Sequence, residues 1–151
     1  MEQEQLVALS QGQANEDLVR RWFEEVWNRQ NASAIDEILT PDCVAYGLPD
    51  PDAVLRGPEA FKQVHAEFCD AFPDIQIEVN DVIAAGDRVA ARWRATGTHS
   101  GDGLGFAPTG KRIVLDGATI VVIRDGRMQE GWNMMDMGHL FCSLRGDGSR
   151  F

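Results

Sequence analysis

The chain has little cysteine, few positive charges and no long apolar run. Its cysteines, Cys43, Cys69 and Cys142, are odd in number and show no CxxC spacing, which indicates reduced thiols instead of disulfides or a zinc site. A run of about 18 apolar residues is missing, so we expect no transmembrane helix. The first residues lack a basic start followed by an apolar stretch, so we expect no signal peptide and a cytoplasmic protein.

The charge balance is strongly acidic, with 24 Asp and Glu against 14 Lys and Arg. A net charge of -10 repels phosphate backbones and anionic lipids, so we expect neither nucleic acid nor membrane as a partner. The stretch GDGLGFAPTGK has the glycines of a phosphate loop but lacks the GxxxxGK[ST] spacing and precedes a strand. No GxSxG elbow and no metal-ligand spacing occurs, which disfavours a serine hydrolase or a metal site.

The length of 151 residues predicts one domain. We expect a flexible segment at 1–14, a single domain at 15–145 and a C-terminal tail at 146–151. Apolar residues at helical spacing predict a first helix that starts after Asn15 and ends near Asn28. Two further helices are predicted, at 33–40 and from Pro58 onward.

After Pro73 the pattern changes to alternation, which is typical of strands. Gly86-Asp87 and Asp125-Gly126 are hairpin turn signals. The strands are predicted at 75–86, 88–101, 111–124 and 127–141. Helices followed by hairpin-linked strands indicate an α+β fold with helices on one face of a curved sheet, which encloses a concave space for a small ligand.

The stretch EGWNMMD, residues 130–136, is the main candidate for a polar site. If it stays extended, one face carries Glu130, Trp132, Met134 and Asp136. Trp and Met predict that this face points inward, where a carboxylate can act as general acid or base. Glu130 would lie about 20 Å from Asp136, too far for a two-carboxylate mechanism. The alternative is that the strand ends earlier, and Asp136 lies in water or caps the next segment.

Arginine and histidine supply further candidates. Arg92 alternates with apolar neighbours, and a solvent-facing position is favoured over a role in holding a substrate carboxylate or carbonyl. His65 lies on an apolar helix face, which is more often the place of a satisfied core histidine. His99 leaves a strand beside a glycine-rich loop, so we expect it to be more exposed and able to reach a ligand.

Four tryptophans are many for this length, and they could pack the core and a dimer face or line an aromatic cavity.

Four stretches carry a resemblance to a known family, in the order in which they occur there: WFEEVWN, AIDEILTPDCV, LGFAPTGKRI and IRDGRMQEGWNMMD. In these stretches the chain resembles the SnoaL-like polyketide cyclases, a branch of the nuclear transport factor two-like superfamily. The resemblance implies a cone-shaped α+β barrel with about three N-terminal helices packed on a strongly curved, mostly antiparallel sheet, often as a homodimer.

The resemblance also implies an activity. In such cyclases an aspartate after the E-x-W strand, here Asp136, assists an aldol-type ring closure of a polyketide-like polycyclic molecule without metal or cofactor. His99 would border the pocket, and Tyr46 stands where many relatives have histidine. The candidate substrate-binding residues are Trp22, Tyr46, His65, Arg92, Phe106 and Trp132.

Two alternatives stay open at this point. One is a non-catalytic protein that binds a small molecule in the same pocket. The other is dehydration or epoxide opening, and epoxide opening needs two carboxylates bridged by an arginine. Arg92 with Asp136 and Asp116 could provide that set if all three faced inward.

Overall fold

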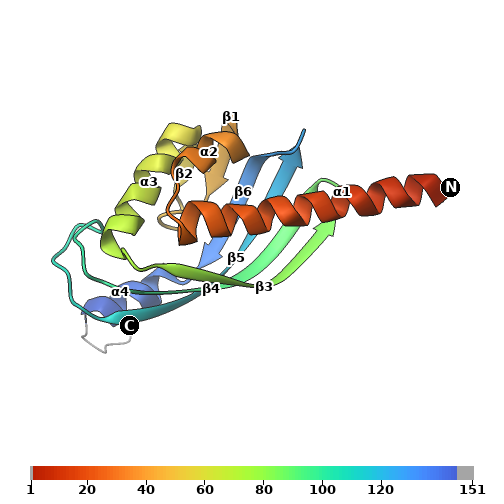
Figure 1. The fold of residues 1–151 in the computed structure, drawn as a ribbon. Coiled ribbons are helices and arrows are strands. Elements are labelled where there is room, and N and C mark those ends of the chain that lie inside the picture. The colour runs from red at the N-terminus through yellow and green to blue at the C-terminus, as the bar shows by residue number, and fades with distance from the viewer. Residues whose placement is uncertain (1, 146–151) are drawn as a thin grey trace.

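A curved six-stranded sheet forms the frame of the molecule, and helices cover its inner face (Figure 1). The computed structural model describes residues 2–145. The helical elements are α1 (Glu2–Arg21), the π-helical segment η1 (Trp22–Asn28), α2 (Ser33–Ile38), α3 (Pro58–Ala71) and α4 (Met137–Arg145). The strands are β1 (Leu39–Tyr46), β2 (Val54–Arg56), β3 (Gln76–Ala85), β4 (Arg88–Thr98), β5 (Arg112–Arg124) and β6 (Arg127–Met135).

The strand order is β2-β1-β6-β5-β4-β3, with a parallel pair at β1 and β6 and antiparallel pairs elsewhere. Strands β2 and β3 form the two edges, so the sheet is curved but unclosed. This confirms the predicted α+β class with helices packed on a mostly antiparallel sheet. The predicted tail at 146–151 lies outside the described residues.

The first helix begins earlier than the sequence pattern predicted. Residues 2–14 belong to α1, so the predicted start after an N-cap at Asn15 is wrong. This segment contains good helix formers and no proline, so nothing interrupts the helix. Asn15 is instead buried, and its side-chain amide donates to the carbonyl of Gly86 at 3.4 Å. Within residues 2–145, no helix is both long and apolar enough to cross a membrane.

The predicted faces of β4 are confirmed. The side chains of Val89, Ala91, Trp93 and Ala95 are buried on the inner face. Arg92 and Arg94 are exposed between them, on the outer face. Their guanidinium groups pair with Asp81 at 2.6 Å and Asp116 at 2.7 Å.

The alternation in β6 is interrupted by a β-bulge. Ile123 pairs with Met128, but the next residue of β5, Val122, pairs with Glu130, so Gln129 is an extra residue. One extra residue moves every later side chain to the opposite face of the sheet. The prediction that the face of Trp132, Met134 and Asp136 points inward is therefore wrong.

Candidate ligand-binding site

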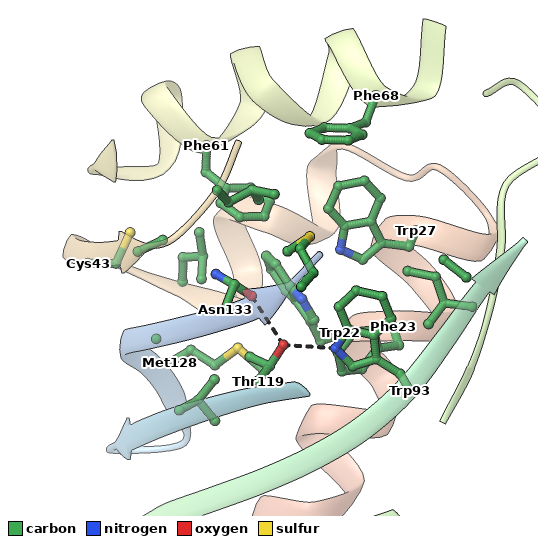
Figure 2. Close-up of a pocket in the computed structure, with 18 of the residues that line it drawn as sticks. Trp22, Phe23, Trp27, Cys43, Phe61, Phe68, Trp93, Thr119, Met128 and Asn133 are labelled. Carbon is green, nitrogen blue, oxygen red and sulfur yellow. Dashed lines mark hydrogen bonds between the residues drawn. The ribbon is translucent and has the colours of Figure 1, made fainter. Parts of the chain in front are cut away.

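A cavity of about 90 Å³ lies between the inner face of the sheet and the segments η1 and α3 (Figure 2). Helical spacing directs three rings of η1 and two rings of α3 toward the sheet. The aromatic walls are Trp22, Phe23, Trp27, Phe61, Phe68 and, on β4, Trp93. Most of the remaining wall is aliphatic, so the site favours a ligand that is largely apolar.

One row of hydrogen bonds crosses the sheet beside this cavity (Figure 2). The indole N–H of Trp93 donates to Thr119 Oγ1 at 3.0 Å, and Thr119 Oγ1 donates to Asn133 Oδ1 at 3.1 Å. Asn133 Nδ2 donates to the backbone carbonyl of Tyr46 at 3.1 Å. A carbonyl can only accept, so this last bond fixes which end of the Asn133 amide carries the nitrogen.

The amide of Asn133 keeps spare hydrogen-bonding capacity. One of its two N–H groups donates to the backbone carbonyl of Tyr46, and the other remains available. Its oxygen accepts from Thr119 with one lone pair and has a second lone pair available. The backbone behind it is tightly packed, since a Cβ on Gly47 would lie 2.2 Å from the Asn133 carbonyl oxygen. Gly47 also has a φ of +83°, so glycine is required there on both grounds.

Two other polar residues at the wall offer little chemistry to the cavity. Burial raises the pKa of the Cys43 thiol, so this group is protonated near neutral pH. Glu130 borders the cavity, but its carboxylate accepts a hydrogen bond from the Tyr46 hydroxyl at 2.8 Å. This bond is the main reason that the pKa of Tyr46 is raised.

Tyr46 and Trp132 were predicted to bind substrate, but their side chains lie on the outer face of the sheet. Their rings stack with centroids 5.5 Å apart, and the guanidinium of Arg88 lies over the indole at 5.6 Å. Neither residue lines the cavity. The bulge at Gln129 explains this position of Trp132, and Tyr46 is its direct partner in β1.

Asp136 is exposed and does not line the cavity. Its Oδ1 accepts the backbone N–H of His139 at 2.9 Å, and its carbonyl accepts that of Leu140 at 3.1 Å. This is the geometry of a helix N-cap. The alternative prediction, a cap on the segment after the strand, is therefore confirmed for the position of this side chain.

His99 is fully buried, so the prediction of an exposed loop histidine is wrong. Its Nδ1 accepts the backbone N–H of Thr109 at 3.1 Å, which places the proton of the neutral ring on Nε2. Its own backbone bonds to Gly110 and Lys111. Phe106 packs on the imidazole at 5.0 Å. Both predicted site residues hold the loop 99–111 together and do not line the cavity.

His65 was a candidate substrate-binding residue, but it is a core histidine, the alternative that its apolar helix face favoured. It is 4% exposed, and its Nε2 bonds to the carbonyl of Val26 at 2.6 Å. Burial lowers the pKa of His65 and raises that of the neighbouring Cys69 thiol to about 11. The two groups therefore do not form an activated thiol–imidazole pair, and His65 does not line the cavity.

The arrangement required for epoxide opening is absent from the described part of the chain. Arg92 pairs with Asp81, and Asp116 pairs with Arg94, both on the exposed outer face. The prediction that Arg92 binds substrate is therefore wrong for this cavity, which it does not line. Asp136 caps α4 and contacts neither arginine. Within residues 2–145, no group of three or more His, Cys, Asp or Glu side chains could hold a metal ion.

Of the predicted site residues, Trp22 lines the cavity. The sequence pattern missed Thr119 and Asn133, which come together by strand pairing across β5 and β6. The inward alternation of β5 could have identified Thr119. Asn133 was hidden because the bulge that turns it inward has no clear signal in the sequence.

The family model of SnoaL-like polyketide cyclases matches residues 17–142. A comparison with curated sequences gives no significant match. AclR from Streptomyces galilaeus, a proposed hydroxylase, is 29% identical with a TM-score of 0.78 over 93% of this chain and 86% of its own. IdmH from Streptomyces antibioticus, a proposed polyketide cyclase, is 28% identical with a TM-score of 0.74 over 87% of this chain and 98% of its own.

A third structure, a proposed SnoaL-like polyketide cyclase from Jannaschia sp. CCS1, supports the fold alone. It is 24% identical, with a TM-score of 0.80 over 88% of this chain and 92% of its own. The fold is thus that of the nuclear transport factor two-like proteins. The chain belongs to the SnoaL-like polyketide cyclase family.

Proposed function

We propose that this protein is a cyclase or isomerase of the SnoaL type that binds a small, mostly apolar carbonyl compound. The observation that carries the proposal is the hydrogen-bonded row from Trp93 through Thr119 to Asn133 beside an otherwise apolar cavity. A spare N–H on a fixed amide suits a carbonyl oxygen as its acceptor. Membership in a cyclase family supports ring formation as the type of chemistry.

Asn133 would act on the acceptor carbonyl. An intramolecular aldol closure joins the carbon of an enol or enolate to a carbonyl carbon, and the carbonyl oxygen becomes an alkoxide that takes up the proton lost by the carbon acid. A fixed N–H donor stabilises the charge that develops on this oxygen. Thr119 and Tyr46 would serve as positioning residues, since they fix the amide from both ends.

Asp136 has no part in this proposal because its side chain caps α4 outside the cavity. A proton would instead leave from a carbon acid that is acidic enough by itself, with water as the acceptor. Substrates with a carbon between two carbonyl groups meet this requirement.

A second function is favoured by the same position of Asp136 and by the burial of His99 outside the cavity. With neither group at the ligand, the protein would bind the same class of carbonyl compound without converting it. The two functions share a pocket and differ in whether bound ligand reacts.

Nonane-2,4,8-trione tests the choice because its C3 lies between two carbonyl groups and can attack C8, which closes a six-membered β-hydroxy ketone. For a cyclase, ring closure monitored by NMR is faster with the protein than in buffer. Asn133→Leu is expected to slow the reaction at least about threefold, the value of one neutral hydrogen bond. Asn80→Leu makes the same change on the exposed edge strand and should leave the rate unchanged. Binding without acceleration supports the second function, and a rate insensitive to Asn133→Leu contradicts the first.

A further inference from the structure

Trp93 is held in one orientation by contacts on three sides. Its N–H bonds to Thr119, and its ring lies 6.1 Å from that of Phe23. On the sheet side, a Cβ on Gly117 would come within 2.4 Å of the indole, which therefore lies directly on the backbone of β5. A side chain that is 4% exposed and fixed in this way cannot easily swing aside for a larger ligand.

The wall opposite Trp93 is also interlocked. Trp22 packs on Phe61 at 5.1 Å, and Trp27 packs on Phe61 and Phe68, each at 6.2 Å. These rings come from η1 and α3, so a shift of one ring disturbs both elements. Tilted and T-shaped aromatic pairs of this kind add stability beyond the area they bury.

The cavity is small for a ligand with several fused rings. The cavity holds about 90 Å³. Pockets for drug-sized molecules measure about 300–1,000 Å³, whereas an apolar cavity of about 150 Å³ already binds benzene. The cavity here is smaller than that, so it holds at most a single small ring or the chain that closes into one.

We propose that Trp93 is the specificity-determining residue that restricts the substrate to a one-ring carbonyl compound. This inference rests on the proposed function for the carbonyl group, but the size limit depends on the walls and not on Asn133. Trp93 would act in two ways, as the fixed wall beside the carbonyl site and as the donor that orients Thr119. A second fused ring would already weaken binding, and substrates with three or more fused rings would be excluded.

Binding of aryl ketones with increasing ring number tests the size limit. The probes are acetophenone, 1-tetralone and 9-fluorenone, with one, two and three rings, and their affinities are measured by calorimetry on the full chain. We expect 9-fluorenone to bind at least about tenfold more weakly than acetophenone, a ratio typical of steric discrimination in apolar pockets. Trp93→Phe removes part of the wall and should narrow this ratio. Trp132→Phe, the same change on the outer face, should leave it unchanged.

Gly131→Ala tests the limit from the opposite direction and does not depend on tolerance of Trp93→Phe. The new methyl group would lie 3.5 Å from Val121 Cγ1, an ordinary contact, at a position that lines the cavity. It should weaken acetophenone about tenfold by filling the space of the ligand. Unchanged acetophenone binding in this variant overturns the size limit.

The remaining outcomes separate the two proposals. The role of Trp93 is overturned if the wild type binds 9-fluorenone as tightly as acetophenone or more tightly. It is also overturned if Trp93→Phe leaves the ratio of these two affinities unchanged. If in addition Asn133→Leu lowers the affinity for 9-fluorenone, the proposed carbonyl site is supported and only the size limit is overturned. If the size limit is observed but Asn133→Leu leaves the affinities for all three ketones unchanged, the proposed carbonyl site is overturned instead. Failure of all three ketones to bind overturns both.

Discussion

The indole of Trp93 lies directly on Gly117, its pairing partner in the neighbouring strand. A Cβ at position 117 would meet three ring atoms at 2.4 to 2.9 Å, closer than side chains pack in proteins. Glycine in the middle of a strand is usually unfavourable, so its presence here has a local reason. It makes room for a ring that forms one wall of the cavity and donates the first hydrogen bond of the polar row.

Gly117→Ala should therefore displace the indole into the cavity. We expect a loss of about 1–3 kcal/mol of unfolding free energy, the usual cost of overpacking, together with loss of acetophenone binding. Urea denaturation and calorimetry measure the two effects. Adding Trp93→Phe to Gly117→Ala should recover part of the stability because the smaller ring relieves the contact. Strictly additive losses in the double variant would show that the two residues do not interact.

Substitutions of Asp136 can distinguish between two roles of its carboxylate, as a helix cap and as a catalytic acid or base. Asn is as good an N-cap as Asp, whereas Ala is poor. Asp136→Asn should thus retain the stability of the wild type, and Asp136→Ala should lose about 1 kcal/mol. Both variants should close nonane-2,4,8-trione at the wild-type rate, because the carboxylate is outside the cavity. A large fall in rate with Asp136→Asn, at unchanged stability, would restore Asp136 as an acid or base.

Much of the fold could be predicted from the sequence because local patterns determine it. The alternation of β4 and the turn signals at 86–87 and 125–126 correctly indicated hairpin-linked strands. Pro58 at the start of α3 also corresponds to the predicted helix start. These features depend on neighbours within a few residues, which a single sequence displays directly.

The site could not be predicted in the same way, because one residue decides which face is inward. Without the extra Gln129, the hairpin register would continue from Met128, and Trp132 would share its inner face. Because of the bulge, Asn133 and not Trp132 lies on the inner face of the sheet. Asp136 follows the strand and caps the start of α4. The bulge involves pairing with both neighbouring strands, since the register against β1 also shifts before Glu130. Such long-range pairing is not visible in the spacing of β6 alone.

His99 provides a test of how the loop 99–111 is held. Loss of its Nδ1 removes the acceptor of the Thr109 backbone N–H, and because this bond is only partly buried the cost is about 0.5–1.5 kcal/mol. His99→Leu should therefore speed hydrogen exchange at Thr109 and Gly110. His99→Gln has a volume similar to that of His and keeps an acceptor oxygen, so it should protect these amides better. Equal exchange in the two variants would mean that packing with Phe106, and not the hydrogen bond, holds the loop.

The carboxylate of Asp74 should make stability depend on acid pH. Its Oδ1 accepts the backbone N–H of Thr98 at 2.7 Å, and this bond is the main reason that the pKa of Asp74 lies below its usual value of 3.8. A depressed pKa in the folded state means that the charged form stabilises the fold above the unfolded pKa. The contribution is lost as pH falls through the lower, folded pKa.

Asp74→Asn keeps an acceptor for Thr98 but does not titrate. It should be less stable than the wild type at pH 7, and the difference should shrink as pH falls below about 4. Because Asp74 is exposed, solvent screening keeps this difference small, so paired urea titrations at several pH values are needed. A difference that stays constant from pH 7 to about pH 3 would mean that the charge of Asp74 does not contribute through Thr98.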